Sequence, residues 1–244
     1  MQVNDSIFTA EYAVIEFTTS ELLQLSRNEQ EFVLSASLIL NDVRFHWAII
    51  GRTKEDSEDQ TLKTMQMVRA LWALRKLASV IVEANTILGQ YIGKITQLRE
   101  LVDGGARVLA VNSASKNYLV VAENLRNRTA FHYGPKELVD HLANFKNETI
   151  HRIYPHKQHG NSISAVCEQI LTGPTILNAF EGASLNGFQD WCLKNSNSIV
   201  TFCNTALGEI IARHFPDKSY STVDIEMGEE ASDISHRWPL FMIT

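Results

Sequence analysis

Residues 62–89 read LKTMQMVRALWALRKLASVIVEANTILG, and this stretch decides the fold class of the chain. Apolar residues recur along it three or four positions apart, which places them on one face of an α-helix. So long an apolar face needs neighbouring helices to cover it. Ser57 and Gln60, just before the stretch, have the spacing of a capping box and predict the start of the helix. Its end is expected at about Gly89.

A second long helix is predicted just before this one, from about residue 27 to residue 50. Ser26 and Glu29 form a capping box at its start, and Gly51 follows its last apolar residue. The apolar residues that keep helical spacing between these ends are Phe32, Val33, Ala36, Ile39, Leu40, Val43 and Trp47. A short polar linker joins the two helices, which favours antiparallel packing.

Further helices are predicted downstream. Helical spacing continues from Tyr91 to the glycine pair at 104–105. It resumes near residues 113–115 and runs to the Gly-Pro pair at 134–135, whose proline then opens a short helix. The last strong pattern spans residues 186–214 and has a broad apolar face.

Three segments lack helical spacing. Residues 1–19 alternate loosely between apolar and polar types, which predicts a short strand or an extended arm. Between Glu148 and Leu171, β-branched residues, histidines and turn formers predict a hairpin or an irregular insertion. The acidic stretch 217–244 is predicted to be a partly ordered tail.

The expected fold class is therefore mainly α: an antiparallel helical bundle with a small β or irregular insertion in the C-terminal half. We divide the chain into an arm at 1–19, the bundle at 20–146 and an acidic tail at 217–244. Between the bundle and the tail, residues 147–216 are expected to hold the insertion and a C-terminal helix that packs on the bundle.

Composition narrows the functional classes. A chain of 244 residues with 45% hydrophobic content can build one main core without disulfides or metal. The formal net charge is −6, so any contact with a polyanion must be local. The three cysteines lack metal or redox spacing and favour reduced, buried thiols in a cytoplasmic protein. Acidic residues near the N-terminus and Glu83 within the most apolar run predict neither export nor a membrane span.

Several catalytic classes lose support because their motifs are absent from the sequence. It contains no Gly-rich phosphate loop, no Rossmann glycine fingerprint, no nucleophile-elbow serine and no His-Glu-x-x-His motif. His151, His156 and His159 do not share one helical face, and no carboxylate pair lies near them. We therefore expect no metal site and no other cofactor.

Positive charge gathers in one window, residues 124–160. It holds five of the eight histidines, and six lysines and arginines against three acidic residues. In an acidic protein this contrast favours an anion-facing surface. A solvated face with chance clustering remains an equal alternative, because charge runs usually have no specific partner.

Arg126 and His132 are the best chemical candidates in this window. Arginine is a permanent bidentate phosphate binder, and histidine takes or gives a proton near neutral pH. These are the minimum parts for metal-free RNA cleavage. One group handles the proton of the 2′-hydroxyl or of the leaving group, and the other stabilises negative charge in the transition state.

The spacing of this pair raises a geometric problem. On a continuous helix, Arg126 and His132 lie about 120° apart, whereas Arg128 and His132 share a face. Arg126 and His132 converge only if the last turn unwinds or if a second subunit completes the site across a two-fold axis. An ordinary structural role also remains open. A histidine in the last turn interacts favourably with the helix dipole, by about 0.3–1 kcal/mol, and arginines beside an apolar stripe aid solubility.

The pattern Arg126-Asn127-x4-His132, near the end of a helix in an all-helical bundle, resembles the R-x(4–6)-H motif of the HEPN superfamily. A polar residue such as asparagine commonly follows the arginine in that family. The wording RNRTAFHYG is similar to that of bacterial members related to abortive-infection and toxin systems. The segments NDVR at 41–44 and RKL at 75–77, the latter followed by Glu83, also resemble that subgroup.

The resemblance covers roughly residues 20–145 and carries functional implications. HEPN proteins are typically dimers in which two motif helices face each other and form a metal-independent ribonuclease site. By this resemblance, Arg126 and His132 are catalytic, and Asn127 orients or contacts the phosphate. Such a dimer also resolves the geometric problem.

The leading hypothesis is a cytoplasmic, metal-independent HEPN-type endoribonuclease in phage defence or acting as a toxin, with a composite site at a homodimer interface. Arg128 and Tyr133 are added as substrate-binding neighbours, and Glu123 as a further neighbour. The expected partners are RNA, a second copy of the chain, and an antitoxin or other protein. The alternatives are a non-catalytic HEPN-like helical module that binds protein or nucleic acid, and a small-molecule binder in the bundle core.

Overall fold

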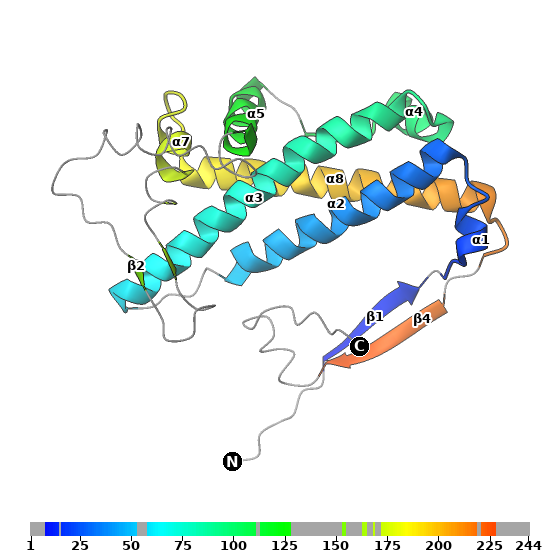
Figure 1. Ribbon diagram of the computed structural model, residues 1–244, viewed down its shortest axis with the longest axis horizontal. Coiled ribbons are helices and arrows are strands. Elements are labelled where there is room, and N and C mark those ends of the chain that lie inside the picture. The colour runs from blue at the N-terminus through cyan, green and yellow to red at the C-terminus, as the bar shows by residue number, and fades with distance from the viewer. Residues whose placement is uncertain are drawn as a thin grey trace, which may run out of the picture.

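The computed structural model of the chain describes residues 8–14, 16–52, 58–110, 113–127, 153–154, 163–164, 168, 172–218 and 221–227. Within these residues the chain is mainly helical, which confirms the mainly α fold class. The long helices α2 (Arg27–Arg52), α3 (Gln60–Ile92) and α8 (Leu185–His214) lie side by side (Figure 1). The figure shows α2 running in the opposite direction to the other two.

The first of these helices starts as its sequence predicts. The backbone N–H of Ser26 donates to Glu29 Oε2 at 2.9 Å, and the N–H of Glu29 donates to Ser26 Oγ at 3.4 Å. These two bonds confirm the predicted capping box and satisfy two N–H groups that the helix leaves unpaired.

The start of α3 corrects the sequence prediction. Its N-cap is Asp59, whose Oδ1 accepts from the backbone N–H groups of Thr61 and Leu62 at 2.7 and 3.1 Å. A carboxylate directly before the first helical residue satisfies these donors well. The predicted capping box of Ser57 and Gln60 is therefore wrong, and Ser57 lies outside the described residues.

The end of α3 also differs from the prediction. The helix passes Gly89 and continues to Ile92, and Gly93 is its C-cap. A glycine inside a helix is tolerated at a modest cost, and burial of Leu88 keeps this turn in place. The helical pattern expected to continue from Tyr91 is broken at this point, and α4 (Thr96–Asp103) starts afresh.

The core lies between the three long helices. The fully buried residues of α3 include Leu77, Ile81 and Leu88, so the apolar face of residues 62–89 points inwards as predicted. Burial of each such side chain contributes about 1.5–3 kcal/mol. A polar contact helps to fix how α2 is aligned along α8. The indole N–H of Trp47 on α2 donates to Ser196 Oγ on α8 at 2.7 Å.

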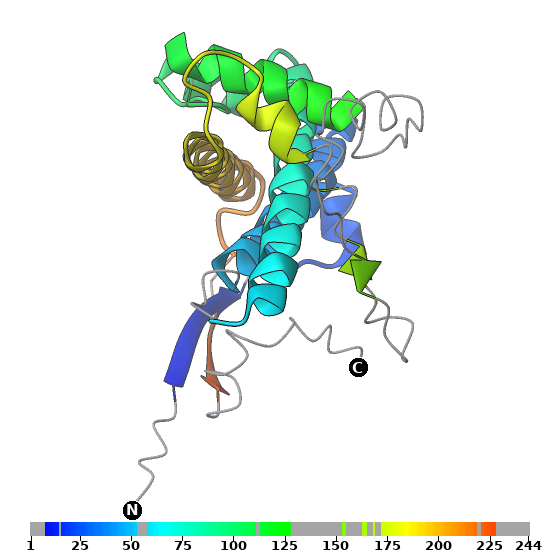
Figure 2. The same ribbon diagram turned by 90° about the vertical axis from the view of Figure 1, so that its left-hand side faces the viewer.

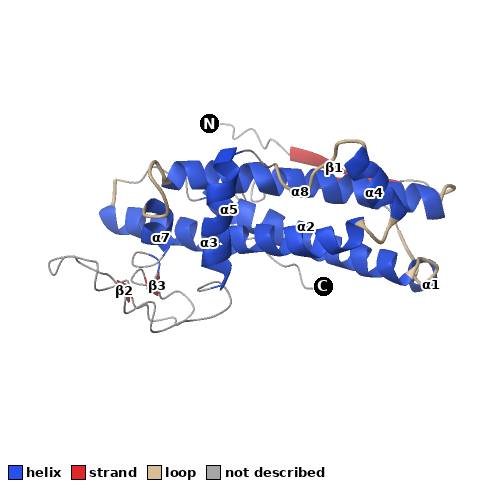
Figure 3. Cartoon of the chain, turned by 90° about the horizontal axis from the view of Figure 1, so that it is seen from above, coloured by secondary structure: helices blue, strands red, loops and turns tan. Residues whose placement is uncertain are grey.

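Helix α5 (Ser113–Leu125) crosses α3 at a steep angle (Figures 2 and 3). Its apolar side is buried through Val121, Ala122 and Leu125. Near the middle of α5, the ring of Tyr118 lies 5.6 Å from the ring of Phe188 on α8, in a tilted arrangement. Aromatic contacts at this separation are favourable. Together these contacts fix the direction in which α5 brings its last residues towards α3.

Two short helices have no clear counterpart in the sequence pattern. They are α1 (Thr19–Leu22) and α7 (Gly173–Leu177), and α7 has a proline in its first turn. Each is too short for apolar spacing to reveal it. Thr18 and Glu21 form a full capping box around α1, which stabilises this short turn locally.

The strands form two small antiparallel pairs. Strand β1 (Phe8–Val14) pairs with β4 (Ser221–Met227), from Phe8 opposite Met227 to Val14 opposite Ser221. Strand β2 (Ile153–Tyr154) pairs with β3 (Ile163–Ser164). The predicted strand in the N-terminal arm is therefore present, and its partner comes from the segment predicted to be a partly ordered tail.

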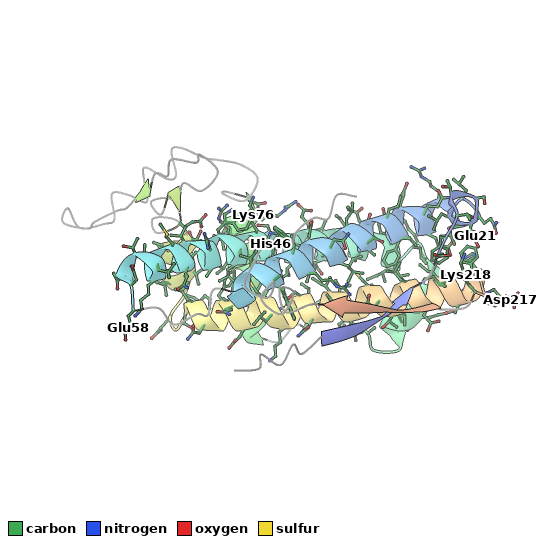
Figure 4. All side chains as sticks on the ribbon, turned by 90° about the horizontal axis from the view of Figure 1, so that it is seen from below. Glu21, His46, Glu58, Lys76, Asp217 and Lys218 are labelled. Carbon is green, nitrogen blue, oxygen red and sulfur yellow. The ribbon has the colours of Figure 1, made fainter. Side chains whose placement is uncertain are left out.

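An ion pair between Lys218 and Glu21 lies close in sequence to the strands β1 and β4. Lys218 Nζ lies 2.5 Å from Glu21 Oε1 and 4.4 Å from the centre of the Phe17 ring. Figure 4 shows Glu21 and Lys218 together at one end of the molecule. The hydrogen bond from Lys218 and bonds from Thr18 lower the pKa of Glu21 from 4.5 to about 2.

Helix α2 also passes a simple test for a membrane-spanning helix. From Arg27 to Ile50 it is long and apolar enough to cross a bilayer by length and composition alone. Core helices of soluble proteins pass the same test, and Phe32, Ala36 and Val43 of α2 are buried in the core. The expected absence of a membrane span stays a prediction.

Candidate functional site

Two of the predicted site residues, Arg126 and Asn127, directly follow α5. Here the helix widens into a π-helical turn directly after Leu125. Leu125 is 1% exposed and anchors the turn on the core, whereas Arg126 is partly exposed and Asn127 is exposed. Turns of this kind often occur at functional sites.

A carboxylate on α3 holds the guanidinium of Arg126. Arg126 Nε donates to Glu83 Oε1 at 2.6 Å, and Nη2 forms an ion pair with the same oxygen. Nη1 donates to the side-chain oxygen of Asn127 at 3.2 Å. The two predicted residues are therefore brought together, with Glu83 as a third member that joins α5 to α3.

This arrangement leaves Arg126 able to bind an anion. A guanidinium has five N–H donors, and the contacts to Glu83 and Asn127 occupy one on each of its three nitrogens. Within the described part of the chain, no contact occupies the second N–H of Nη1 or of Nη2. The side chain of Arg126 is 33% exposed and that of Glu83 is 32% exposed, so solvent and ligands reach the pair. The carboxylate offsets part of the positive charge.

Of the remaining predicted site residues, the structure describes only Glu123. His132, Arg128 and Tyr133 lie outside the described residues, so the convergence of Arg126 and His132 stays a prediction. Glu123 is exposed on α5, about one turn before Arg126.

Glu83 is the site residue that sequence reasoning missed. It was interpreted as an interruption of the most apolar run and as part of the resemblance noted above, and it was given no role in the site. A charged residue within such a run, between Val82 and Ala84 that are both buried, requires a polar partner on a neighbouring element. That requirement was a usable signal, although it did not identify Arg126 as the partner.

A second ion pair lies deeper in the molecule. Arg75 on α3 and Glu168 are 7% and 6% exposed, and two nitrogens of the guanidinium contact the two carboxylate oxygens. The hydroxyl of Thr172 donates to Glu168 Oε2 at 2.6 Å. This bidentate arrangement attaches residues 168 and 172 to the central helix.

Lys76 lies near this pair, and His46 lies near Lys76. They come from α3 and α2 and are neighbours in Figure 4. Desolvation lowers the pKa of Lys76, and the positive charge of Arg75 adds to this effect. Desolvation also lowers the pKa of His46, whose Nδ1 lies 2.7 Å from the carbonyl oxygen of Asp42. Perturbed groups cluster at functional and structural sites alike, and here burial is the main cause of both shifts.

No group of three or more His, Cys, Asp or Glu residues that would suit a metal ion occurs among the described residues. Cys192 and Cys203 are buried on α8, as predicted for these thiols. Burial raises the pKa of Cys192 and raises that of Cys203 to about 12. Thiols in this state are weak nucleophiles, so we assign neither of them a catalytic role.

The fold and this site define a mainly helical protein with a partly exposed arginine, held by a carboxylate, at the end of a crossing helix. Comparison of the chain with protein-family models, curated proteins and solved structures found no match.

Proposed function

We propose that the protein is a metal-independent HEPN-type endoribonuclease that acts in phage defence or as a toxin. The observation that carries the proposal is the placement of Arg126. Its guanidinium is partly exposed, oriented by Glu83, and contacts the Asn127 that follows it in the motif. Preorganised donors of this kind stabilise the charge that develops on a phosphate during cleavage.

The proposed reaction is an internal transesterification. The 2′-oxygen attacks the adjacent phosphorus, and the bond from phosphorus to the 5′-oxygen breaks. The imidazole of His132 in one protomer accepts the 2′-hydroxyl proton, and the imidazole of its partner in a homodimer donates a proton to the leaving 5′-oxygen. Arg126 stabilises the negative charge on the non-bridging oxygens. The products are a 2′,3′-cyclic phosphate and a 5′-hydroxyl.

This proposal includes the expected setting of the protein. The substrate is RNA, the active form is a homodimer in the cytoplasm, and an antitoxin or another protein restrains the activity. Arg128 and Tyr133 contact the substrate beside the reacting phosphate. The mainly helical fold supports the proposal because Arg126 and Asn127 directly follow a helix that packs on a helical core.

The test is cleavage of RNA by the purified full chain in the presence of a chelator. Arg126→Ala and His132→Ala should each reduce the rate by about 10²–10³-fold. Lys116→Ala is a matched control, because Lys116 is an exposed cation on the same helix. The expected products carry 2′,3′-cyclic phosphate ends.

Two outcomes would overturn the proposal. One is full activity in both motif variants. The other is binding of RNA by the wild-type protein without any cleavage, which would support the alternative, a non-catalytic helical module.

A further inference from the structure

We infer that Glu83 is a positioning residue that sets the orientation of the Arg126 guanidinium for RNA cleavage. This inference rests on the proposed ribonuclease function and assigns a role to a residue outside the R-x(4–6)-H motif. Glu83 precedes Arg126 by 43 positions and lies on a different helix, α3. It acts through the arginine and is not expected to touch the substrate.

The contact geometry supports this role. Nε and Nη2 of Arg126 both contact Oε1 of Glu83, so one edge of the guanidinium is engaged by a single carboxylate oxygen. An arginine held at one edge cannot rotate freely about its terminal bonds. The plane of the guanidinium is therefore set by α3, and the remaining N–H groups on Nη1 and Nη2 are presented in a defined direction.

The backbone that carries Glu83 is held in the core, which makes this orientation of the guanidinium stable. Its neighbours in sequence, Val82 and Ala84, are 6% and 0% exposed, and α3 is the central helix of the core. Arg126 in turn follows Leu125, which is 1% exposed. Both partners are attached to buried backbone, whereas their charged groups remain partly accessible. Sites on rigid elements hold their geometry better than sites on loops.

Glu83 acts on Arg126 in two ways, by its negative charge and by holding the guanidinium in place. Removal of Glu83 should affect RNA binding and the cleavage rate differently, so an experiment can separate the two effects. The negative charge of Glu83 weakens the attraction of Arg126 for a phosphate, so its removal should not impair RNA binding. Loss of the acceptor oxygen leaves the guanidinium free to turn, so the chemical step should slow down. A residue that only stabilised the fold would change neither quantity once the protein is folded.

The experiment measures single-turnover cleavage of a short RNA and the Kd for the same RNA with a 2′-deoxy substitution at the scissile position. The full chain is compared with its Glu83→Ala, Glu83→Gln and Glu83→Asp variants. Glu209→Ala serves as the control, because Glu209 is an exposed carboxylate on α8. Circular dichroism establishes that each variant is folded.

We expect Glu83→Ala to reduce the cleavage rate by roughly ten- to a hundredfold without weakening the binding of the uncleavable RNA. Glu83→Gln, which keeps an acceptor oxygen in place, should retain most of the rate. Glu83→Asp keeps the charge but withdraws it by one methylene, so it should be slower than Glu83→Gln. If Glu83→Ala does not fold, the comparison of the cleavage rates of Glu83→Gln and Glu83→Asp still tests the inference.

Three results would overturn the inference. These are a wild-type rate in Glu83→Ala, a loss of rate that is fully accounted for by weaker RNA binding, and an aspartate variant that is faster than the glutamine variant. The failure of the proposed function looks different. In that case the wild-type protein itself does not cleave RNA, or Arg126→Ala cleaves as fast as the wild type.

Discussion

Glu83 on α3 accepts a hydrogen bond of 2.6 Å from Nε of Arg126, which follows it by 43 positions and lies at the end of α5. The pair joins the central helix to the crossing helix at a place that solvent reaches. About a third of each side chain is exposed, at 32% for Glu83 and 33% for Arg126. Partial exposure of this kind suits a group that must meet a ligand.

The exposure of this pair predicts a small contribution to stability. Glu83→Gln should lower the free energy of unfolding by no more than about 1 kcal/mol, because solvent screens partly exposed ion pairs. Urea unfolding near neutral pH measures the change. A loss of several kcal/mol would instead make the pair a structural anchor, and the proposed functional role would lose its basis.

The buried pair of Arg75 and Glu168 should behave differently. Arg75→Met leaves the carboxylate of Glu168 buried without this cation and should destabilise the protein by about 3–5 kcal/mol. The double variant Arg75→Met/Glu168→Leu removes both charges and should recover much of that loss. Urea unfolding of the single and double variants tests this. Equal stability of the wild type and the Arg75→Met variant would contradict the prediction.

The contact between Trp47 and Ser196 predicts a loss when the hydroxyl is removed. Ser196→Ala deprives the indole N–H of an acceptor 2.7 Å away and should cost about 1–3 kcal/mol in unfolding free energy. Ser37→Ala is the matched control, because its exposed hydroxyl donates only to the carbonyl of Val33 in its own helix. Thermal or urea unfolding of both variants is the measurement. Ser196→Ala should be less stable than Ser37→Ala, and equal stability of the two variants would contradict the prediction.

The ion pair of Glu21 and Lys218 predicts a dependence of stability on pH. The pKa of Glu21 in the folded protein is about 2, compared with an ordinary value of 4.5. The unfolded state therefore binds the proton more tightly, and the stabilisation is fully present above pH 4.5. It shrinks as the pH falls below 4.5 and is lost at about pH 2.

Comparison of the wild type with Glu21→Gln checks this dependence. The difference in unfolding free energy should be greatest near neutral pH and should diminish as the solution is acidified. Carboxyl NMR titration of Glu21 provides an independent readout. An unshifted titration of Glu21, or a stability difference that does not change with pH, would contradict the prediction.

The buried thiols of α8 should resist modification. Cys203 has a pKa of about 12, and burial also raises that of Cys192, so almost no thiolate forms near neutral pH. In a Cys167→Ser variant, iodoacetamide should label these two thiols very slowly in the native protein and readily in urea. Rapid labelling of the native protein would show that the core opens or that the thiols are accessible.

The local sequence predicted most of the helical elements correctly. The apolar spacing of residues 62–89 and of residues 27–50 identified α3 and α2, and the Ser26 capping box located the start of α2. These predictions succeed because caps and amphipathic faces depend on residues only a few positions apart. The same locality explains the error at Ser57, since Asp59 was an equally good cap two positions later.

Long-range pairing could not be predicted in this way. No local pattern shows that the strand from Phe8 to Val14 pairs with residues 221–227, which come from the segment predicted to be a partly ordered tail. The partners of Arg126 and Arg75 were hidden for the same reason, because a charged residue in an apolar face requires a counter-ion without specifying which one.

The sequence by itself determined that the chain forms long amphipathic helices around an apolar core and that Arg126 and Asn127 lie side by side at the end of one of them. Only the tertiary structure decided that α5 crosses α3 and that Glu83 engages the guanidinium. The physical reason is the distance along the sequence over which each interaction acts. Helix formation depends on neighbours within one or two turns, whereas the orientation of an arginine depends on whichever helix the packing of the core brings beside it.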